Sequence, residues 1–176
     1  MKNLILAAAL SAALCFGAAE PKVSGKSAAS AEALVNDKFR AGAADPYDIL
    51  GTARCTYLDG YGALVTVELQ LIYVSPPSPF RAPYSSAEIQ SVRDRKIKKL
   101  PQLKDTMRGV LASLAAALDR VPATEKVSIE ARLWRFNWED SRGVPGRVVM
   151  TAERGQLLAV QAVHGDIASV IQEEEQ

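Results

Sequence analysis

The apolar residues of this chain change their spacing twice, and the order of these changes limits the folds available to it. In residues 51–73 and again in residues 127–152, apolar and polar side chains alternate one by one, as in strands with one buried face. Between them, residues 89–118 carry apolar side chains every three or four positions, as an amphipathic helix does. The chain therefore predicts an α+β fold in which a long helix packs on one face of a sheet.

Turn-forming residues interrupt each alternating stretch once. Asp59 and Gly60 divide the first stretch, and glycine accepts the positive φ that a tight hairpin turn requires. The segment SRGVPG, residues 141–146, divides the second stretch. We expect two β-hairpins, and hence an antiparallel sheet with a ββαββ core.

The long helix has a start signal and an internal proline. Ser85 and Glu88 have the spacing of a capping box, which marks a helix N-terminus. Pro101 lies within the apolar stripe, where a proline removes one hydrogen bond and clashes with the preceding turn. We therefore expect either a kink near Leu100 or two abutting helices that share a face.

The terminal parts of the chain give weaker patterns. Residues 30–41 and 156–165 indicate short helices, whereas residues 166–176 fit a helix or a strand equally well. Residues 20–29 are small and polar and read as a flexible lead-in. We expect residues 30–176 to form a single α+β domain.

The first 19 residues have the form of a signal peptide. Lys2 precedes an apolar run, and small residues at Gly17–Ala19 offer a cleavage site. A lipid anchor on Cys15 is the less favoured alternative, because Leu14 stands where lipoprotein signals have a small residue. No apolar run is long enough for a transmembrane helix. We expect a secreted or periplasmic protein.

Charge and cysteine content exclude several functions. Removal of residues 1–19 takes away Lys2 and leaves 20 basic against 20 acidic side chains, a balance that gives no field to attract nucleic acid. The remaining chain holds one cysteine, Cys55, and one histidine, His164, too few for a zinc site or a disulfide. We expect no metal and no cofactor, with Cys55 as a small buried side chain and His164 as a solvated one.

The strand that begins at residue 127 offers one candidate binding surface. If Val127 and Ile129 point inward, alternation places three aromatic residues and two charged ones on the opposite face, where they could form a stacking platform for a sugar ring or an apolar ligand. The alternative is that the N-terminal helix, the C-terminal segment or a second copy of the chain covers this face, the last as a homodimer through the open sheet face. The candidate ligand-binding residues are Trp134, Phe136, Trp138, Glu130, Arg132 and, from the first hairpin, Glu68.

A second candidate surface is basic. Residues 93–108 carry seven basic and two acidic side chains, which could contact anionic lipid or an acidic protein. The alternative is the solvated outer side of a helix, although Lys96 also falls within the apolar stripe. The candidate residues of this basic face are Arg93, Lys96, Lys99 and Lys104.

These patterns favour an exported, non-enzymatic binding or interaction domain whose partner is an envelope glycan, an anionic lipid or another protein. The alternative function is a small cell-envelope hydrolase that uses Glu68 and Glu130, since glycosidases act through two carboxyl groups. The alternation places both side chains on the same sheet face but does not determine their separation.

Overall fold

The computed structural model describes residues 23–41, 47–80 and 82–176. The expected signal peptide of residues 1–19, Cys15 within it, and residues 20–22 of the lead-in lie outside these ranges. The described residues form three α-helices and an open sheet of six strands, so the expected α+β class is confirmed.

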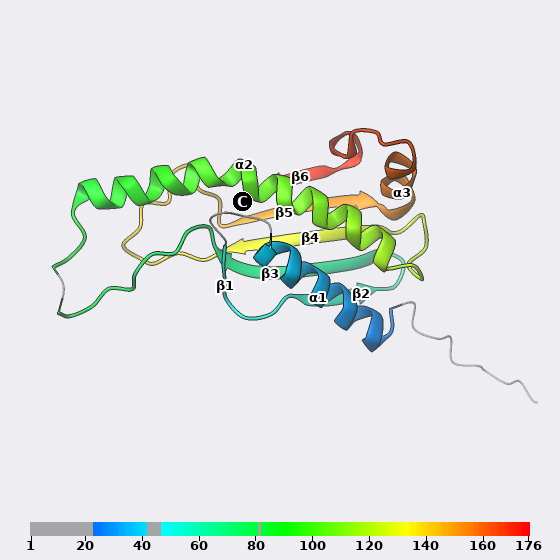
Figure 1. Ribbon diagram of the computed structural model, residues 1–176, viewed down its shortest axis with the longest axis horizontal. Coiled ribbons are helices and arrows are strands. Elements are labelled where there is room, and N and C mark those ends of the chain that lie inside the picture. The colour runs from blue at the N-terminus through cyan, green and yellow to red at the C-terminus, as the bar shows by residue number, and fades with distance from the viewer. Residues whose placement is uncertain (1–22, 42–46, 81) are drawn as a thin grey trace, which may run out of the picture.

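The helices α1 and α2 lie on the same side of the sheet, and α3 lies at one end of it (Figure 1). In chain order the elements are α1 (Gly25–Ala41), β1 (Asp48–Ile49), β2 (Arg54–Leu58), β3 (Gly62–Gln70), α2 (Ser86–Ala117), β4 (Lys126–Leu133), β5 (Arg147–Glu153), α3 (Arg154–Ala162), a short 3-10 helix (Ile167–Val170) and β6 (Gln172–Glu175).

The sheet is mixed rather than antiparallel. Its order is β1-β3-β4-β5-β6, with β2 pairing beside β1 on the same edge of β3. The pairs β2–β3 and β4–β5 are antiparallel as expected, but β3 and β4 are parallel. The expected all-antiparallel ββαββ arrangement is therefore wrong, because α2 is a crossover connection that returns the chain to the end of the sheet where β3 began.

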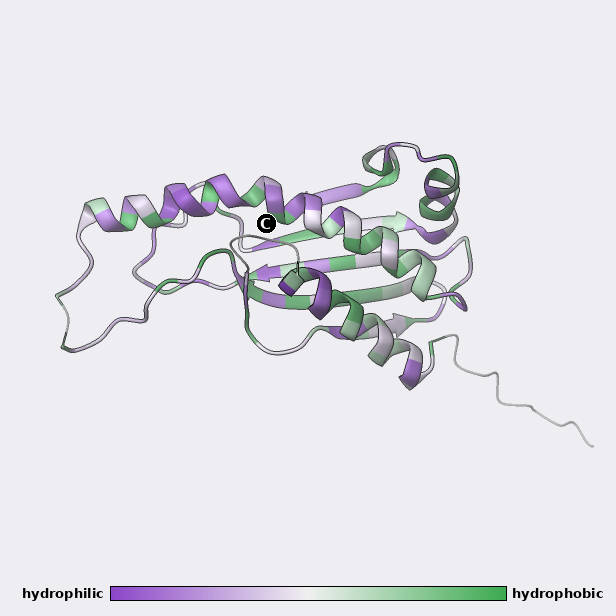
Figure 2. Ribbon diagram, in the orientation of Figure 1, coloured by the Kyte–Doolittle hydropathy of each residue, from purple (hydrophilic) through white to green (hydrophobic). Residues whose placement is uncertain are grey.

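The core lies between the sheet and the two long helices. Alternate residues of the central strands face the helices α1 and α2 and are fully buried, and Figure 2 shows hydrophobic residues in green interspersed with hydrophilic ones along these strands. Burial of each Val, Leu, Ile or Met side chain among them stabilises the fold by about 1.5–3 kcal/mol. The interface includes Val65, Val67 and Leu69 of β3, Val127, Ile129 and Ala131 of β4, and Leu103, Met107, Leu111 and Leu114 of α2.

The start of α2 agrees with the sequence. The Ser85 hydroxyl accepts a hydrogen bond from the Glu88 amide at 3.3 Å, and the Glu88 carboxylate accepts one from the Ser85 amide at 2.8 Å. The helix continues as one element through Pro101. The alternative of two abutting helices is wrong, whereas a kink near Leu100 stays a prediction.

The N-terminal helix is longer than expected and also covers a sheet edge. It begins at Gly25 rather than Ser30, because the Ser24 hydroxyl caps it by accepting from the Ser27 amide at 3.2 Å, so part of the expected lead-in is helical. Its Asn36 and Glu32 side chains accept hydrogen bonds from the backbone amides of Ala53 and Cys55, at 3.1 Å and 2.9 Å. These bonds tie α1 to the outer edge of β2 and to the residue before it.

The C-terminal segment ends in a strand, which is one of the two alternatives that the sequence pattern left open. The helix expected at residues 156–165 is present as α3, but β6 follows it and is polar throughout (Figure 2). Lys104 of α2 makes ion pairs with Glu173, at 2.8 Å, and with Glu175, while Arg108 contacts Glu173 at 3.0 Å. Ion pairs to the helix thus replace apolar burial on the inner face of β6.

The attachment of β6 should depend on pH. Hydrogen bonding to Lys104 lowers the pKa of Glu173 below its ordinary value of 4.5, and the same bond raises the pKa of Lys104 above 10.5. The glutamate contribution is present above pH 4.5 and is lost as the pH falls through the lowered pKa of Glu173. The lysine contribution is present below pH 10.5 and is lost as the pH rises through its raised pKa.

We expect Glu173→Gln to lower the free energy of unfolding at pH 7 by less than about 1 kcal/mol, because the pair is partly exposed. This difference from the wild type should disappear in urea titrations at acid pH. Glu174→Gln, on the other face of β6, is the control and should show no such pH dependence. A Glu173→Gln difference that stays constant down to pH 2 would contradict the role of the ion pair.

The hairpin between β2 and β3 contains two glycines that differ in how well they should tolerate a side chain. Gly62 has a φ of +130°, and a Cβ there would lie 1.9 Å from the backbone oxygen of Lys126, whereas Gly60, with a φ of +76°, has no atom within 4 Å of a Cβ. We expect Gly60→Ala to cost about 1 kcal/mol. Gly62→Ala should cost about 3 kcal/mol or more, since backbone strain and overlap add. Equal urea midpoints for the two variants would show that the close approach of Gly62 to the Lys126 backbone does not affect stability.

Candidate functional site

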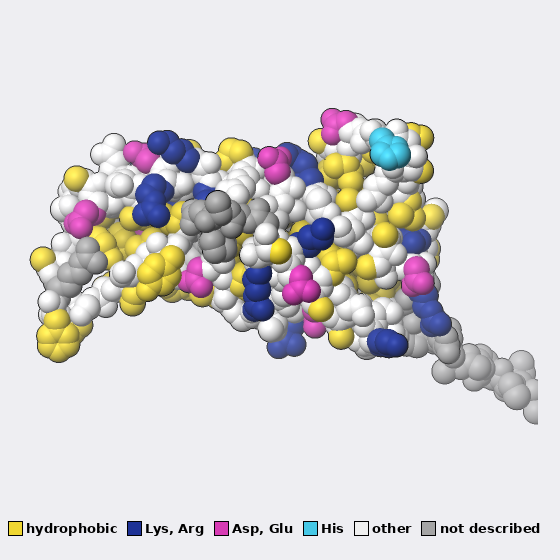
Figure 3. Space-filling model, in the orientation of Figure 1, with side chains coloured by type: hydrophobic (Ala, Val, Ile, Leu, Met, Phe, Trp, Pro, Cys, Tyr) yellow, Lys and Arg dark blue, Asp and Glu magenta, His cyan; other side chains and the backbone are white. Residues whose placement is uncertain are grey.

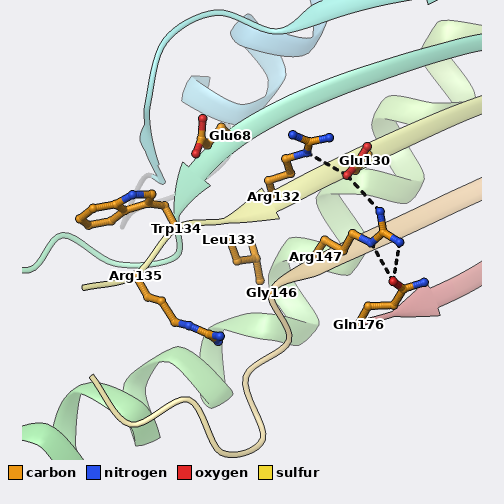
Figure 4. Close-up of a pocket in the computed structure, with 9 residues that line it drawn as sticks. All are labelled: Glu68, Glu130, Arg132, Leu133, Trp134, Arg135, Gly146, Arg147 and Gln176. Atoms are coloured by element: carbon orange, nitrogen blue, oxygen red, sulfur yellow. Dashed lines mark hydrogen bonds and ion pairs between the residues drawn. The ribbon is translucent and has the colours of Figure 1, made fainter. Parts of the chain in front are cut away.

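A hollow lies on the uncovered face of the sheet, where β3 and β4 end. Its volume is about 560 Å³. Because these two strands are parallel, their carboxyl ends meet at one edge, which is where open α/β sheets commonly bind ligands. The lining residues are Glu68, Glu130, Arg132, Leu133, Trp134, Arg135, Gly146, Arg147 and Gln176 (Figure 4).

Glu130 holds two guanidinium groups in this hollow. Its side chain is only 7% exposed, and it accepts a hydrogen bond from Nε of Arg132 at 2.9 Å. Nη1 of Arg147 lies 3.8 Å from the same carboxylate oxygen, and Nε of Arg147 donates to the Gln176 side chain at 3.1 Å. Arg132 and Arg147 are direct partners across β4 and β5. The buried carboxylate therefore offsets a repulsion between like charges that would weaken this strand pair.

Three further side chains line the hollow: Trp134, whose ring packs edge-on against Phe136 with centroids 4.5 Å apart, Glu68 and Arg135. The Trp134 amide donates to the Leu69 carbonyl at 2.9 Å, which fixes its backbone just beyond the strand pair, and its side chain is 37% exposed. The side chains of Glu68 and Arg135 are exposed and have no hydrogen bond or ion pair within the ranges that the structure describes. The hollow thus offers an aromatic ring, a carboxylate and a guanidinium group.

Phe136 and Trp138 do not belong to this surface. The strand ends at Leu133, so the side chains that follow no longer alternate between the two sheet faces, although the residue types still do. Phe136 stacks on Trp138 with ring centroids 5.9 Å apart, and Trp138 stacks on Tyr84 at 4.0 Å. Both rings pack on a small second core of Ile72, Val74 and Val92. The predicted platform of three exposed aromatic residues is therefore wrong, and of these three residues only Trp134 lines the hollow.

The predicted basic face of α2 is not a free surface. Lys96 and Lys99 are buried: Lys96 pairs with Glu139, and Nζ of Lys99 lies 5.2 Å from the ring centroid of Tyr47. Both lysines fall on the inward stripe of the helix, which is why a count of charges along the sequence misplaced them.

The other two residues of the predicted basic face also have partners within the protein. Lys104 is paired with β6, and Nε of Arg93 donates to the Arg142 carbonyl at 2.7 Å. Figure 3 shows Lys and Arg side chains scattered over the helix side of the molecule rather than gathered along α2. The four candidates therefore do not form one exposed cationic surface.

The remaining reactive residues offer no chemistry to the hollow. Burial, together with the charge of Glu32, raises the pKa of the Cys55 thiol to about 11, so it is not a thiolate at neutral pH. His164 is exposed at the end of α3, with a φ of +53°. In the part of the chain that the structure describes, no three His, Cys, Asp or Glu side chains converge on a metal position. None of the helices placed there has the length and apolar character needed to cross a membrane.

Sequence reasoning missed several lining residues. Arg147 could have been found, because Val148 and Met150 face inward and alternation turns Arg147 outward. Gln176 could not, since the strand before it has no alternating pattern. Arg135 follows Trp134 beyond the end of the strand, where alternation no longer predicts direction.

Comparisons of this chain with protein-family models, with curated proteins and with solved structures found no match. The function is therefore inferred from the geometry and charge of the hollow.

A buried ion pair supports the loop that leads out of the site. Glu139 pairs with Lys96 and also accepts from the Phe136 amide at 3.0 Å, which fastens the loop after Trp134 to α2. We expect Lys96→Met to cost about 3–5 kcal/mol of unfolding free energy, because it leaves a buried carboxylate unpaired. The double variant Lys96→Met/Glu139→Gln should recover part of this loss, because it also removes the unpaired carboxylate.

Urea denaturation provides the measurement, with Lys98→Met, on the exposed side of the same helix turn, as the control expected within about 0.5 kcal/mol of the wild type. If Lys96→Met matched Lys98→Met, the ion pair would not be holding the loop.

Proposed function

We propose that this protein is an exported, non-enzymatic binding domain that takes its ligand in the hollow at the carboxyl ends of β3 and β4. One observation carries the proposal: a single hollow on the uncovered sheet face is lined by Glu68 of β3 and, distant in sequence, by Glu130 and Arg132 of β4 and Trp134 just after it (Figure 4). Side chains with only a solvating role need not converge in this way.

A glycan is the ligand class that this combination supports best. A sugar ring has an apolar face that stacks on an aromatic side chain and a rim of hydroxyl groups that need donors and acceptors. Trp134 supplies the ring, Arg132 and Arg135 supply donors, and Glu68 supplies an acceptor. An exported protein would meet such molecules in the cell envelope.

The other partners fit the surface less well. Anionic lipid would need an exposed cationic surface, whereas the basic side chains of α2 are paired or buried. A homodimer through the open sheet face would desolvate Glu68 and Arg132, and charged residues are depleted from the centres of protein interfaces.

Hydrolysis by Glu68 and Glu130 is the second candidate function. It is favoured by one observation, that both side chains line the same hollow. Glu130, however, is buried and engaged by two guanidinium groups, so it is poorly placed to exchange a proton with a substrate. Binding without turnover is therefore preferred.

Calorimetric titration of the purified protein with soluble neutral and acidic oligosaccharides tests the proposal. We expect saturable binding of at least one of them and a loss of about tenfold in affinity for Trp134→Ala, equivalent to about 1.4 kcal/mol. The control is Tyr73→Ala, which removes an aromatic side chain that is 67% exposed outside the hollow. Equal effects of the two variants, or no saturable binding, would refute the proposed site.

The same mixtures of protein and oligosaccharide distinguish binding from hydrolysis. Mass spectrometry after prolonged incubation should show intact oligosaccharides. Shortened products that disappear with Glu68→Gln would establish the hydrolase instead.

A further inference from the structure

We propose that the hollow selects saccharides that carry a carboxylate group, and that Arg132 is the residue that receives this carboxylate. The inference rests on the proposed function above and adds the chemical class of the ligand.

The first argument is the way in which Arg132 is held. Its Nε donates to the buried carboxylate of Glu130 at 2.9 Å, while the side chain as a whole is 61% exposed. Its two terminal nitrogens have no hydrogen-bond partner among the described residues. The guanidinium group is therefore oriented at one edge and open at its end, and a planar fork of this kind binds carboxylates through two parallel hydrogen bonds.

The second argument is the unequal use of the two arginines that Glu130 holds. Arg147 directs its nitrogens at the protein, with Nε and Nη2 bonded to the Gln176 side chain and Nη1 near Glu130. Figure 4 shows these interactions as dashed lines, whereas Arg132 has one, to Glu130. Arg147 therefore offsets the charge of the buried Glu130 carboxylate while its nitrogens are engaged within the protein. Arg132 is the arginine of the pair whose terminal nitrogens can donate hydrogen bonds to an anionic group of a ligand.

The third argument concerns Glu68 and Arg132. They are direct partners across the parallel strands β3 and β4, yet no ion pair joins them in the described structure. Opposite charges so close on one sheet face would ordinarily bond to each other. Because they do not, a ligand finds donors on Arg132 and an acceptor on Glu68. A uronate, which is a sugar that carries a carboxylate, can bind to both side chains: Arg132 donates hydrogen bonds to its carboxylate, and Glu68 accepts them from its hydroxyl groups.

The position of Trp134 fits the same ligand. It lies two residues beyond Arg132 along the chain, and both residues line the hollow, with their side chains directed away from each other (Figure 4). Two residues of extended chain span about 6.6 Å. Because the two side chains diverge from this backbone spacing, the fitting ligand is an oligosaccharide, with one sugar ring on Trp134 and the acid group of another on Arg132.

The test compares two probes with the same sugar rings, one carrying free carboxylates and the other methyl esters. Tetragalacturonate and its fully methyl-esterified form have the same rings, and both are titrated calorimetrically into the full-length purified protein. We expect the acid to bind at least tenfold more tightly than the ester, and the preference to decrease as salt is added. This comparison uses wild-type protein and so does not depend on the folding of a variant.

Variants then identify the residue that is responsible for the preference for the acid over the ester. Arg132→Gln should abolish the difference between acid and ester, and Arg132→Lys should retain only part of it, because a lysine keeps the charge but lacks the fork. Arg54→Gln is the matched control, an exposed arginine on β2 outside the hollow, and should keep the full difference. Equal thermal midpoints of the variants would confirm that each one is folded.

The outcomes separate the two proposals. Equal binding of acid and ester, or binding of neutral oligosaccharides alone, overturns the carboxylate inference and leaves the binding site in place. Absence of binding by every saccharide overturns both proposals. Binding to phosphatidylglycerol vesicles that exceeds saccharide binding and is lost with Arg132→Gln would assign the site to an anionic lipid headgroup and would also overturn the inference.

Discussion

The packing of α2 across the sheet determines the rest of this structure. A helix that must bury one apolar stripe along the strands carries the chain back to the end where β3 began, and the next strand then runs parallel to it. The parallel pair brings the carboxyl ends of β3 and β4 together at one edge of the sheet. Glu68 and Arg132, distant in sequence, thereby become neighbours in one hollow.

Local periodicity predicted what depends on a few neighbouring residues. The α+β class, the two antiparallel pairs and the capping box at Ser85 are all present, and four of the six predicted ligand residues line one hollow. The parallel centre of the sheet could not be predicted in this way, because the partner of a strand is chosen by the whole packing arrangement. Phe136 and Trp138 were misplaced because the alternation of residue types continues beyond Leu133, where the strand itself ends.

The charged residues show a second limit of sequence reasoning. Seven basic residues in one segment suggested a cationic surface, yet buried Lys96 pairs with Glu139, and Lys104 and Arg108 hold a strand of glutamates against the helix. The same ion pairs explain why the pattern left residues 166–176 undecided between helix and strand, since β6 is not held in place by apolar side chains. In contrast, the guanidinium end of Arg132 stays open because the neighbouring carboxylate takes only its Nε.

The hydrogen bonds from α1 to the β2 edge also affect how the sheet meets other molecules. Any further strand added beside β2 would have to bond to the amides of Ala53 and Cys55, which Asn36 and Glu32 already occupy. Exposed strand edges are a common route to aggregation, and proteins block them with side chains or helices. The domain is thus protected against stacking into extended sheets along this border, while the border at β6 carries consecutive glutamates that repel an identical chain.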